Sequence, residues 1–174
     1  WPPASATRAG PWAVRGGGGG GKRVSAATAG GAWGEDDVPA AETAMQLMGQ
    51  DALFMLRDGE TALDNALAAR GYEVIDPVNL WVCPVETLTH VPVPRVTAFA
   101  IWEPLAIMHD SWAKGGIGSE RIAVMERAVG PKTGILGRIA DKPAGAAFCA
   151  MHDAIAMVHA VEIASDHRRK GLGV

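Results

Sequence analysis

The chain has 174 residues, of which 48% are apolar and 20% charged, a balance typical of one folded domain or two small ones. Sixteen Lys and Arg stand against 19 Asp and Glu, so the charge excludes a broad attraction to nucleic acid or an anionic membrane, and neither is expected as a partner. Two cysteines exclude a disulfide framework and paired cysteine metal ligands, so we expect a cytoplasmic protein without a metal.

The N-terminal segment is rich in Gly, Ala and Pro and contains an unbroken glycine run, residues 16–21. Such a run is too flexible for a regular element, so we predict a hairpin between residues 12–15 and 22–27 with the glycines at its tip. Lys22 follows the glycines as in phosphate-binding loops of nucleotide-binding proteins, but Arg23 stands where those loops need a hydroxyl group for magnesium. A nucleoside-triphosphate site is therefore not expected.

The next segment predicts an alternation of helices and strands. Apolar residues at helical spacing predict a helix over residues 37–48, which Gly49 ends. A strand is predicted over residues 52–57, a helix over 62–70 and a strand over 72–75. Together these elements predict an α/β region.

Prolines at positions 84, 92 and 94 surround a stretch of low predicted order near His90. We therefore place a boundary near Val93. Residues 1–92 form the predicted N-terminal α/β region with its glycine-rich loop, and residues 93–174 form a second domain.

The second domain begins with a strand and two helices. The strand is predicted over residues 95–102, and the helices over 104–114 and 119–128, before a breaking Gly-Pro pair. A further strand is predicted over residues 134–140, followed by a turn.

Residues 144–164 are rich in alanine, so intrinsic propensity favours a helix there. A helix of this length could cross a bilayer. However, the segment contains His152, Asp153, His159 and Glu162, which are costly in hydrocarbon. We therefore expect a buried element of a soluble protein.

The last residues carry the most specific motif. Arg168-Arg169-Lys170-Gly171-Leu172-Gly173 match the pattern Arg/Gln-x-x-Gly-x-Gly/Ala. A strand end, a turn with two glycines and a helix start direct several backbone N–H groups at one point, where the helix dipole adds positive potential. Glycines also let the backbone approach a pyrophosphate closely. The segment therefore predicts a phosphate site, and the alternative is a solvated chain end.

This motif and the elements before it, over residues 93–174, resemble the GNAT superfamily of acetyl-CoA-dependent N-acetyltransferases. The resemblance implies an α/β (α+β) fold, with a mixed, mostly antiparallel sheet flanked by helices, and it implies strands at residues 144–151 and 154–163 in place of a helix. Residues 1–92 resemble a partial GNAT half. Members of the family continue beyond this loop, so the chain is expected to be incomplete.

The resemblance implies transfer of an acetyl group from acetyl-CoA to a primary amine of a small molecule or peptide, by direct attack in a ternary complex. The alternative is a non-catalytic GNAT-like module that binds an acyl-CoA or a protein partner. The resemblance is compatible with a homodimer. The acceptor pocket is expected near residues 101–117, with Trp102, His109 and Trp112 as candidate lining residues.

The resemblance also implies the residues of the site. The backbone of residues 161–163 would pair with the acetyl-pantetheine arm, and the amides of residues 168–174 would hold the pyrophosphate. His159 is the first candidate for the general base and Glu162 the second. The alternative is that His159 is a core histidine and Glu162 a cross-strand polar partner. The expected cofactor-binding residues are Val161, Glu162, Ile163, Arg168, Arg169, Lys170, Gly171, Leu172, Gly173 and Val174.

Overall fold

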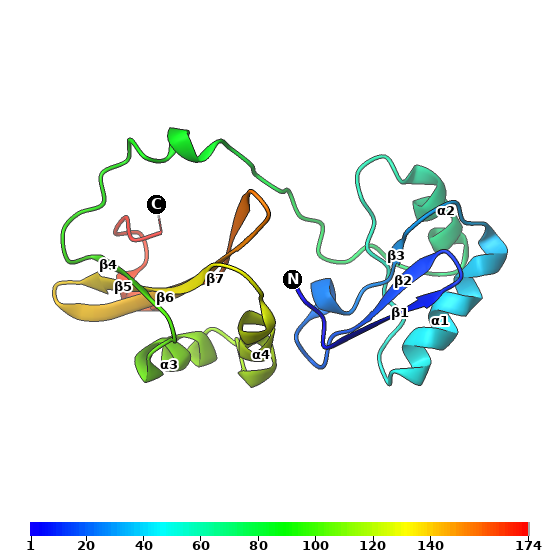
Figure 1. Ribbon diagram of the computed structural model, residues 1–174, viewed down its shortest axis with the longest axis horizontal. Helices are drawn as coiled ribbons and strands as arrows, with labels where there is room; N and C mark the ends of the chain where they lie inside the picture. Colours follow the sequence, from blue (N-terminus) through cyan, green and yellow to red (C-terminus); the bar gives the residue numbers. More distant parts are fainter. Residues whose placement is uncertain (174) are drawn as a thin grey trace. The chain divides into compact units, whose positions relative to one another are not determined.

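A computed structural model describes residues 1–173 of the chain, which is divided into two compact units, Trp1–Cys83 and Pro84–Val174. The division falls ahead of the boundary that the sequence predicts between residues 92 and 93. Each unit has its own antiparallel sheet, and the described residues form four α-helices (Figure 1). The predicted combination of helices with mostly antiparallel sheet is confirmed at this level.

Unit 1, Trp1–Cys83, is built on a small sheet with the strand order β1-β2-β3, on which helix α1 packs. Its elements are β1 (Ser5–Ala9), β2 (Trp12–Gly16), β3 (Thr28–Ala29), α1 (Val38–Leu47) and α2 (Thr61–Ala69). Both helices that the sequence predicts in this region are confirmed.

The core of unit 1 contains a cluster of aromatic rings among aliphatic side chains. Trp12 is fully buried, and its ring meets that of Phe54 at 5.2 Å between centroids and that of Trp33 at 5.9 Å. Tyr72 extends the cluster, because its ring lies edge-on to Phe54 at 5.4 Å. Such edge-to-face pairs stabilise a core beyond the area that they bury. These contacts join strand β2 to Phe54, which lies between the two helices, and through it to Tyr72, which follows α2.

The predicted hairpin between residues 12–15 and 22–27 is wrong. Strand β2 pairs instead with β1, and residues Lys22–Val24 form a turn of 3₁₀ helix. Gly10, with φ of 58°, closes the observed hairpin between Ala9 and Trp12. A short turn costs less closure entropy than a loop of glycines, which explains the choice of partner.

The predictions of two other strands in this region, over residues 52–57 and 72–75, are also wrong. Residues 52–57 contribute only one isolated parallel bridge, between Phe54 and Ala27. Strand β3 is two residues long, so it offers no partner for a longer ladder. Residues 72–75 have no strand structure at all.

A polar cluster links α1 to the residues that follow α2. Glu42 accepts hydrogen bonds from the Arg70 guanidinium at 2.9 Å and from the Tyr72 hydroxyl at 2.9 Å. The hydrogen bond from Arg70 lowers the pKa of Glu42 below its ordinary value of 4.5. Burial, together with the bond to Glu42, raises the pKa of Tyr72 to about 12.

This cluster predicts a loss of stability in acid. A carboxyl group whose pKa is lower in the folded state stabilises the fold above its unfolded pKa, near 4.5, and this stabilisation is lost as the pH falls through the folded pKa. The side chain of Glu42 is 29% exposed, so we expect a loss of at most about 1 kcal/mol. Amide hydrogen exchange in α1, compared between pH 6 and pH 3, measures it. The Glu42→Gln variant should lose less stability than the wild-type protein between pH 6 and pH 3. An equal loss of stability would contradict the role of the Glu42 carboxyl group.

Unit 2, Pro84–Val174, contains a four-stranded antiparallel sheet in the order β4-β5-β6-β7. Helices α3 and α4 lie on one side of it in Figure 1. The elements are β4 (Ala98–Ile101), α3 (Ala106–Lys114), α4 (Ser119–Arg127), β5 (Lys132–Ile139), β6 (Lys142–His152) and β7 (Ile155–Ile163). All six elements predicted here are present, and β4 is shorter than predicted.

The alanine-rich segment forms strands, so the prediction of a hairpin over residues 144–163 is confirmed. Ala144, Ala146 and Phe148, at every second position of β6, are buried, and so is Gly145 between them. This burial, together with pairing to strands on both sides, outweighs the helix propensity of alanine. Within residues 1–173, no helix is both long and apolar enough to cross a bilayer.

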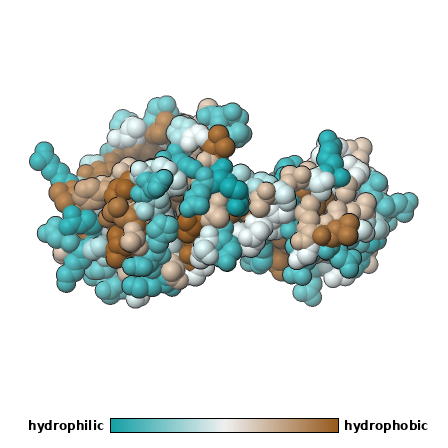
Figure 2. All heavy atoms as spheres, turned by 60° about the horizontal axis from the view of Figure 1, so that its bottom comes forward, coloured by the Kyte–Doolittle hydropathy of each residue, from teal (hydrophilic) through white to brown (hydrophobic). Residues whose placement is uncertain are grey.

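Large apolar side chains also reach the surface. The segment after α2 exposes Trp81 by 92% and Val82 by 90%. Figure 2 shows apolar areas on unit 2, at the left, set among hydrophilic side chains. In this unit the exposed large apolar residues include Leu105, Ile155, Val158 and Val161.

Candidate functional site

Strand β7 contains a bulge shortly before its end. Its ladder with β6 changes register between the pairs Phe148↔His159 and Ala146↔Glu162, which leaves one extra residue in β7. Within this interval Ala160 adopts a left-handed backbone with φ of 50°. A bulge of this kind bends the strand and redirects the residues that follow it.

The end of β7 presents its backbone at a free sheet edge, since β7 is the last strand in the order. Ala164 N–H donates to Ala144 O at 2.9 Å, so these two residues face each other as a hydrogen-bonded pair. In an antiparallel ladder, bonding to a neighbour alternates from one residue to the next. Ile163 and Val161 therefore direct their N–H and C=O groups away from β6. Arg168 Nε already donates to Ile163 O, at 2.9 Å.

The loop after β7 has a conformation suited to exposed amides. A 3₁₀ turn, Ser165–His167, is followed by two residues with positive φ, Arg169 at 62° and Gly171 at 84°. The N–H groups of residues 171–173 donate no hydrogen bond to any acceptor within the described residues 1–173. Successive backbone N–H groups in such turns form concavities that bind anions.

Leu172 fixes this loop against the sheet. A Cβ on Gly137 of β5 would lie 3.0 Å from Leu172 Cδ2, so the leucine packs closely over this glycine. The next loop residue, Gly173, lies close to Ile163, because a Cβ on it would be 3.0 Å from Ile163 Cδ1. The loop therefore folds back onto the sheet beside the end of β7.

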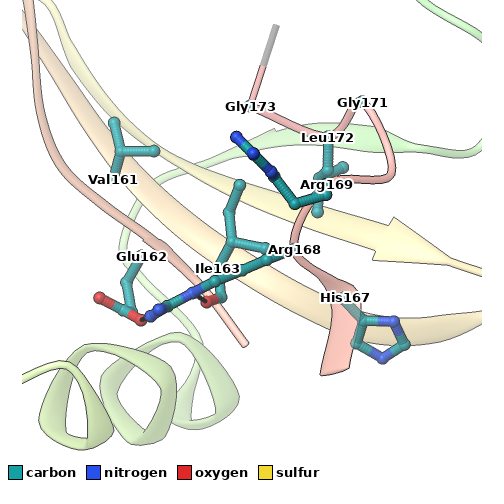
Figure 3. A pocket seen from close by; sticks show the side chains of 9 residues that line it. All are labelled: Val161, Glu162, Ile163, His167, Arg168, Arg169, Gly171, Leu172 and Gly173. Carbon is teal, nitrogen blue, oxygen red and sulfur yellow. Dashed lines mark hydrogen bonds and ion pairs between the residues drawn. The ribbon is translucent and has the colours of Figure 1, made fainter. Parts of the chain in front are cut away.

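The strand end and the loop enclose one open cavity of about 410 Å³ (Figure 3). It gathers all the residues predicted to bind the cofactor except Lys170, which does not line it, and Val174, which lies outside the described residues. Its lining residues are Val161, Glu162, Ile163, His167, Arg168, Arg169, Gly171, Leu172 and Gly173.

The two arginines of this cavity differ in their partners. Arg168 extends toward Glu162 in Figure 3, and its guanidinium lies 3.0 Å from the Glu162 carboxylate. Arg169 makes no ion pair with any residue of the described chain. An anion in the cavity would therefore meet one uncommitted guanidinium and a set of free amides.

His167 is a lining residue that the sequence analysis missed. Its side chain is only 16% exposed, and its buried Nδ1 has no hydrogen-bond partner within residues 1–173. Its Nε2 lies 3.7 Å from the carboxylate of Asp166. The available signal was its position directly before the basic motif, which alone does not distinguish a lining residue from a turn residue.

The two candidate bases occupy different places. Glu162 lines the cavity, and its side chain packs against the end of α3, where a Cβ on Gly115 would overlap the carboxylate. His159 lies opposite Phe148 in the ladder, is partly buried, and is not among the residues that line the cavity.

Unit 2 has a second cavity, of about 400 Å³, among the segment after β4, helices α3 and α4, and the start of β5. Of the predicted acceptor residues, Trp102 and His109 line it, whereas Trp112 is buried elsewhere. Lys132 Nζ is held there by Glu126 O at 2.6 Å and lies 4.6 Å from the Trp102 ring centroid. The remaining lining residues are Glu103, Pro104, Ile122, Met125 and Glu126.

No group of three or more His, Cys, Asp or Glu side chains among residues 1–173 is arranged to hold a metal ion.

Comparisons of the chain with protein-family models, with curated proteins and with solved structures find no match.

Proposed function

We propose that unit 2 is a GNAT-type N-acetyltransferase that binds acetyl-CoA in the cavity at the end of β7 and acetylates a primary amine. One observation carries this proposal: the free edge of β7 and a loop with unbonded amides line the same cavity. A cosubstrate with an extended amide-bearing arm next to a diphosphate is complementary to both parts.

The diphosphate would bind at the loop. The amides of residues 171–173 and the Arg169 guanidinium have no partner within the described chain, and both favour an anion. The overall charge of −3 gives no general attraction for anions, so this local arrangement would have to supply the affinity.

The pantetheine arm would bind along β7. It carries two amide groups, which can pair with an exposed strand edge as an added strand does. Val161 and Ile163 direct their backbone groups to that edge. Binding of this kind depends on the backbone, so the side chains at these positions can vary.

In the proposed reaction, the amine nitrogen attacks the thioester carbonyl carbon. The new C–N bond replaces the C–S bond, a base takes the proton from the amine, and the CoA sulfur leaves as a thiolate that is then protonated. Glu162 and His159 are the candidate bases. A bound diphosphate would compete with Glu162 for Arg168, which would release the carboxylate within the cavity.

Two measurements test the proposal. Isothermal titration with acetyl-CoA should give a saturable heat, and a panel of primary amines should then produce release of the CoA thiol. The absence of heat with acetyl-CoA would overturn the assignment.

A non-catalytic acyl-CoA-binding module is the second candidate. The observation that favours it is the placement of the bases, because His159 does not line the cavity and Glu162 is bound to Arg168. Acetyl-CoA binding without thiol release for any amine of the panel would select this alternative.

A further inference from the structure

We propose that Trp112 of α3 is a positioning residue for the acyl arm, because it holds the bulge that sets the edge of β7. The inference rests on the proposed function, since its consequence is the affinity for the arm of acetyl-CoA. Trp112 lines neither of the two cavities and acts through Ala160.

The contact itself is well defined. Trp112 is fully buried, and its indole N–H donates to Ala160 O at 2.9 Å, across 48 residues of sequence. A buried indole needs an acceptor, and the carbonyl of Ala160, a residue inside the bulge, supplies it. The left-handed backbone of Ala160 is unfavourable for a residue with a Cβ, so the indole compensates for a strained conformation.

The bulge determines which groups of β7 reach the free edge. Ala160 directly precedes Val161, the first lining residue of the cavity. If the bulge were lost, the ladder would slip by one residue. Each following residue would then direct its N–H and C=O groups to the opposite side of the strand. Val161 and Ile163 would turn toward β6, and the proposed strand-like contacts with the arm would disappear.

A second contact of the same helix supports this role. Gly115, at the C-terminal end of α3, lies against the Glu162 side chain, two residues beyond Ala160. The last turn of α3 therefore contacts β7 on both sides of Val161. The hydrogen bond of the Trp112 side chain goes to Ala160 and not to the loop of residues 168–173.

Trp112→Phe tests the inference because it removes the donor and keeps a buried aromatic ring, although a smaller one. Two ligands separate the parts of the site: acetyl-CoA, and adenosine 3′-phosphate 5′-diphosphate, which has the diphosphate but no pantetheine. The loss of one buried hydrogen bond should weaken acetyl-CoA binding about tenfold in titration calorimetry. The nucleotide should bind with unchanged affinity.

Met108→Leu is the matched control, since Met108 is also fully buried on α3 but contacts Gly134 of β5. It should leave both affinities unchanged. Trp112→Phe with Ala160→Gly should recover acetyl-CoA binding, because glycine adopts this φ without strain. Equal weakening of both ligands by Trp112→Phe, or no weakening of either, would overturn the inference.

A ligand-free measurement keeps this inference separate from the proposed function. Trp112→Phe should accelerate amide hydrogen exchange in residues 155–164, and Met108→Leu should not. If the wild-type protein binds neither ligand, the proposed function fails, and the exchange data still decide whether Trp112 holds the bulge. Unchanged exchange in Trp112→Phe would refute it.

Discussion

Replacement of Gly171 by Glu is expected to raise the dissociation constant for acetyl-CoA at least about 100-fold, equivalent to about 2.7 kcal/mol. The new carboxylate would stand in the loop whose amides are proposed to hold the diphosphate, and like charges at close range cost several kcal/mol. Space does not limit the substitution, because a Cβ at Gly171 meets no atom within 4 Å. Titration calorimetry with acetyl-CoA measures the effect.

The matched control is Gly59→Glu in unit 1. Gly59 has φ of 85°, against 84° for Gly171, and a Cβ there also meets no atom within 4 Å. The two variants therefore carry the same charge change and the same backbone strain, at positions in different units. Gly59→Glu should bind acetyl-CoA as the wild-type protein does. Similar affinities in the two variants would exclude the loop as the diphosphate site.

Gly145→Ala is expected to destabilise unit 2 by about 1–3 kcal/mol, the usual cost of an overpacked core. A Cβ on Gly145 would lie 2.5 Å from Glu162 O and 3.2 Å from Ile163 Cα. Both obstructing atoms belong to the backbone of β7, so the strand end itself must move. The opening free energy from hydrogen exchange in β6 and β7 measures the loss, and acetyl-CoA binding should weaken as the edge shifts.

Gly137→Ala is the control, because Gly137 and Gly145 are direct partners in the β5–β6 ladder. The nearest atoms to a Cβ on Gly137 belong to the Leu172 side chain, at 3.0 Å, and this flexible side chain can give way. We expect Gly137→Ala to lower the stability of unit 2 by less than about 1 kcal/mol, since small overpacking is relieved by rotamer changes. Equal losses in the two variants would show that the β7 backbone is not the limiting contact.

The local patterns of this chain predicted much of unit 2. The helices near residues 104–114 and 119–128 follow from apolar spacing and helix-ending glycines, which are local signals. The hairpin of β6 and β7 was predicted from a family resemblance, against the propensity of its alanines. Its strands form because they pair with each other, β6 also pairs with β5, and both pack on α3, and these contacts are tertiary effects.

Unit 1 shows where local patterns fail. The local pattern of residues 12–27 does not show that β2 pairs with β1, which precedes it, and that residues 22–24 form a 3₁₀ turn. The short turn at Gly10 and the aromatic cluster around Trp12 decide the pairing. The predicted strand at residues 52–57 failed because the strand beside it, β3, is too short to extend the ladder.

The same distinction holds for the candidate site. By itself the sequence determined the basic, glycine-containing segment and the apolar residues before it, because both are contiguous segments. Only the tertiary structure decided that Arg168 binds Glu162, that His167 lines the cavity, and that Trp112 meets Ala160. These contacts depend on the register of β7 and on where the last turn of α3 packs, and side-chain packing between distant segments leaves no periodic signal in a single sequence.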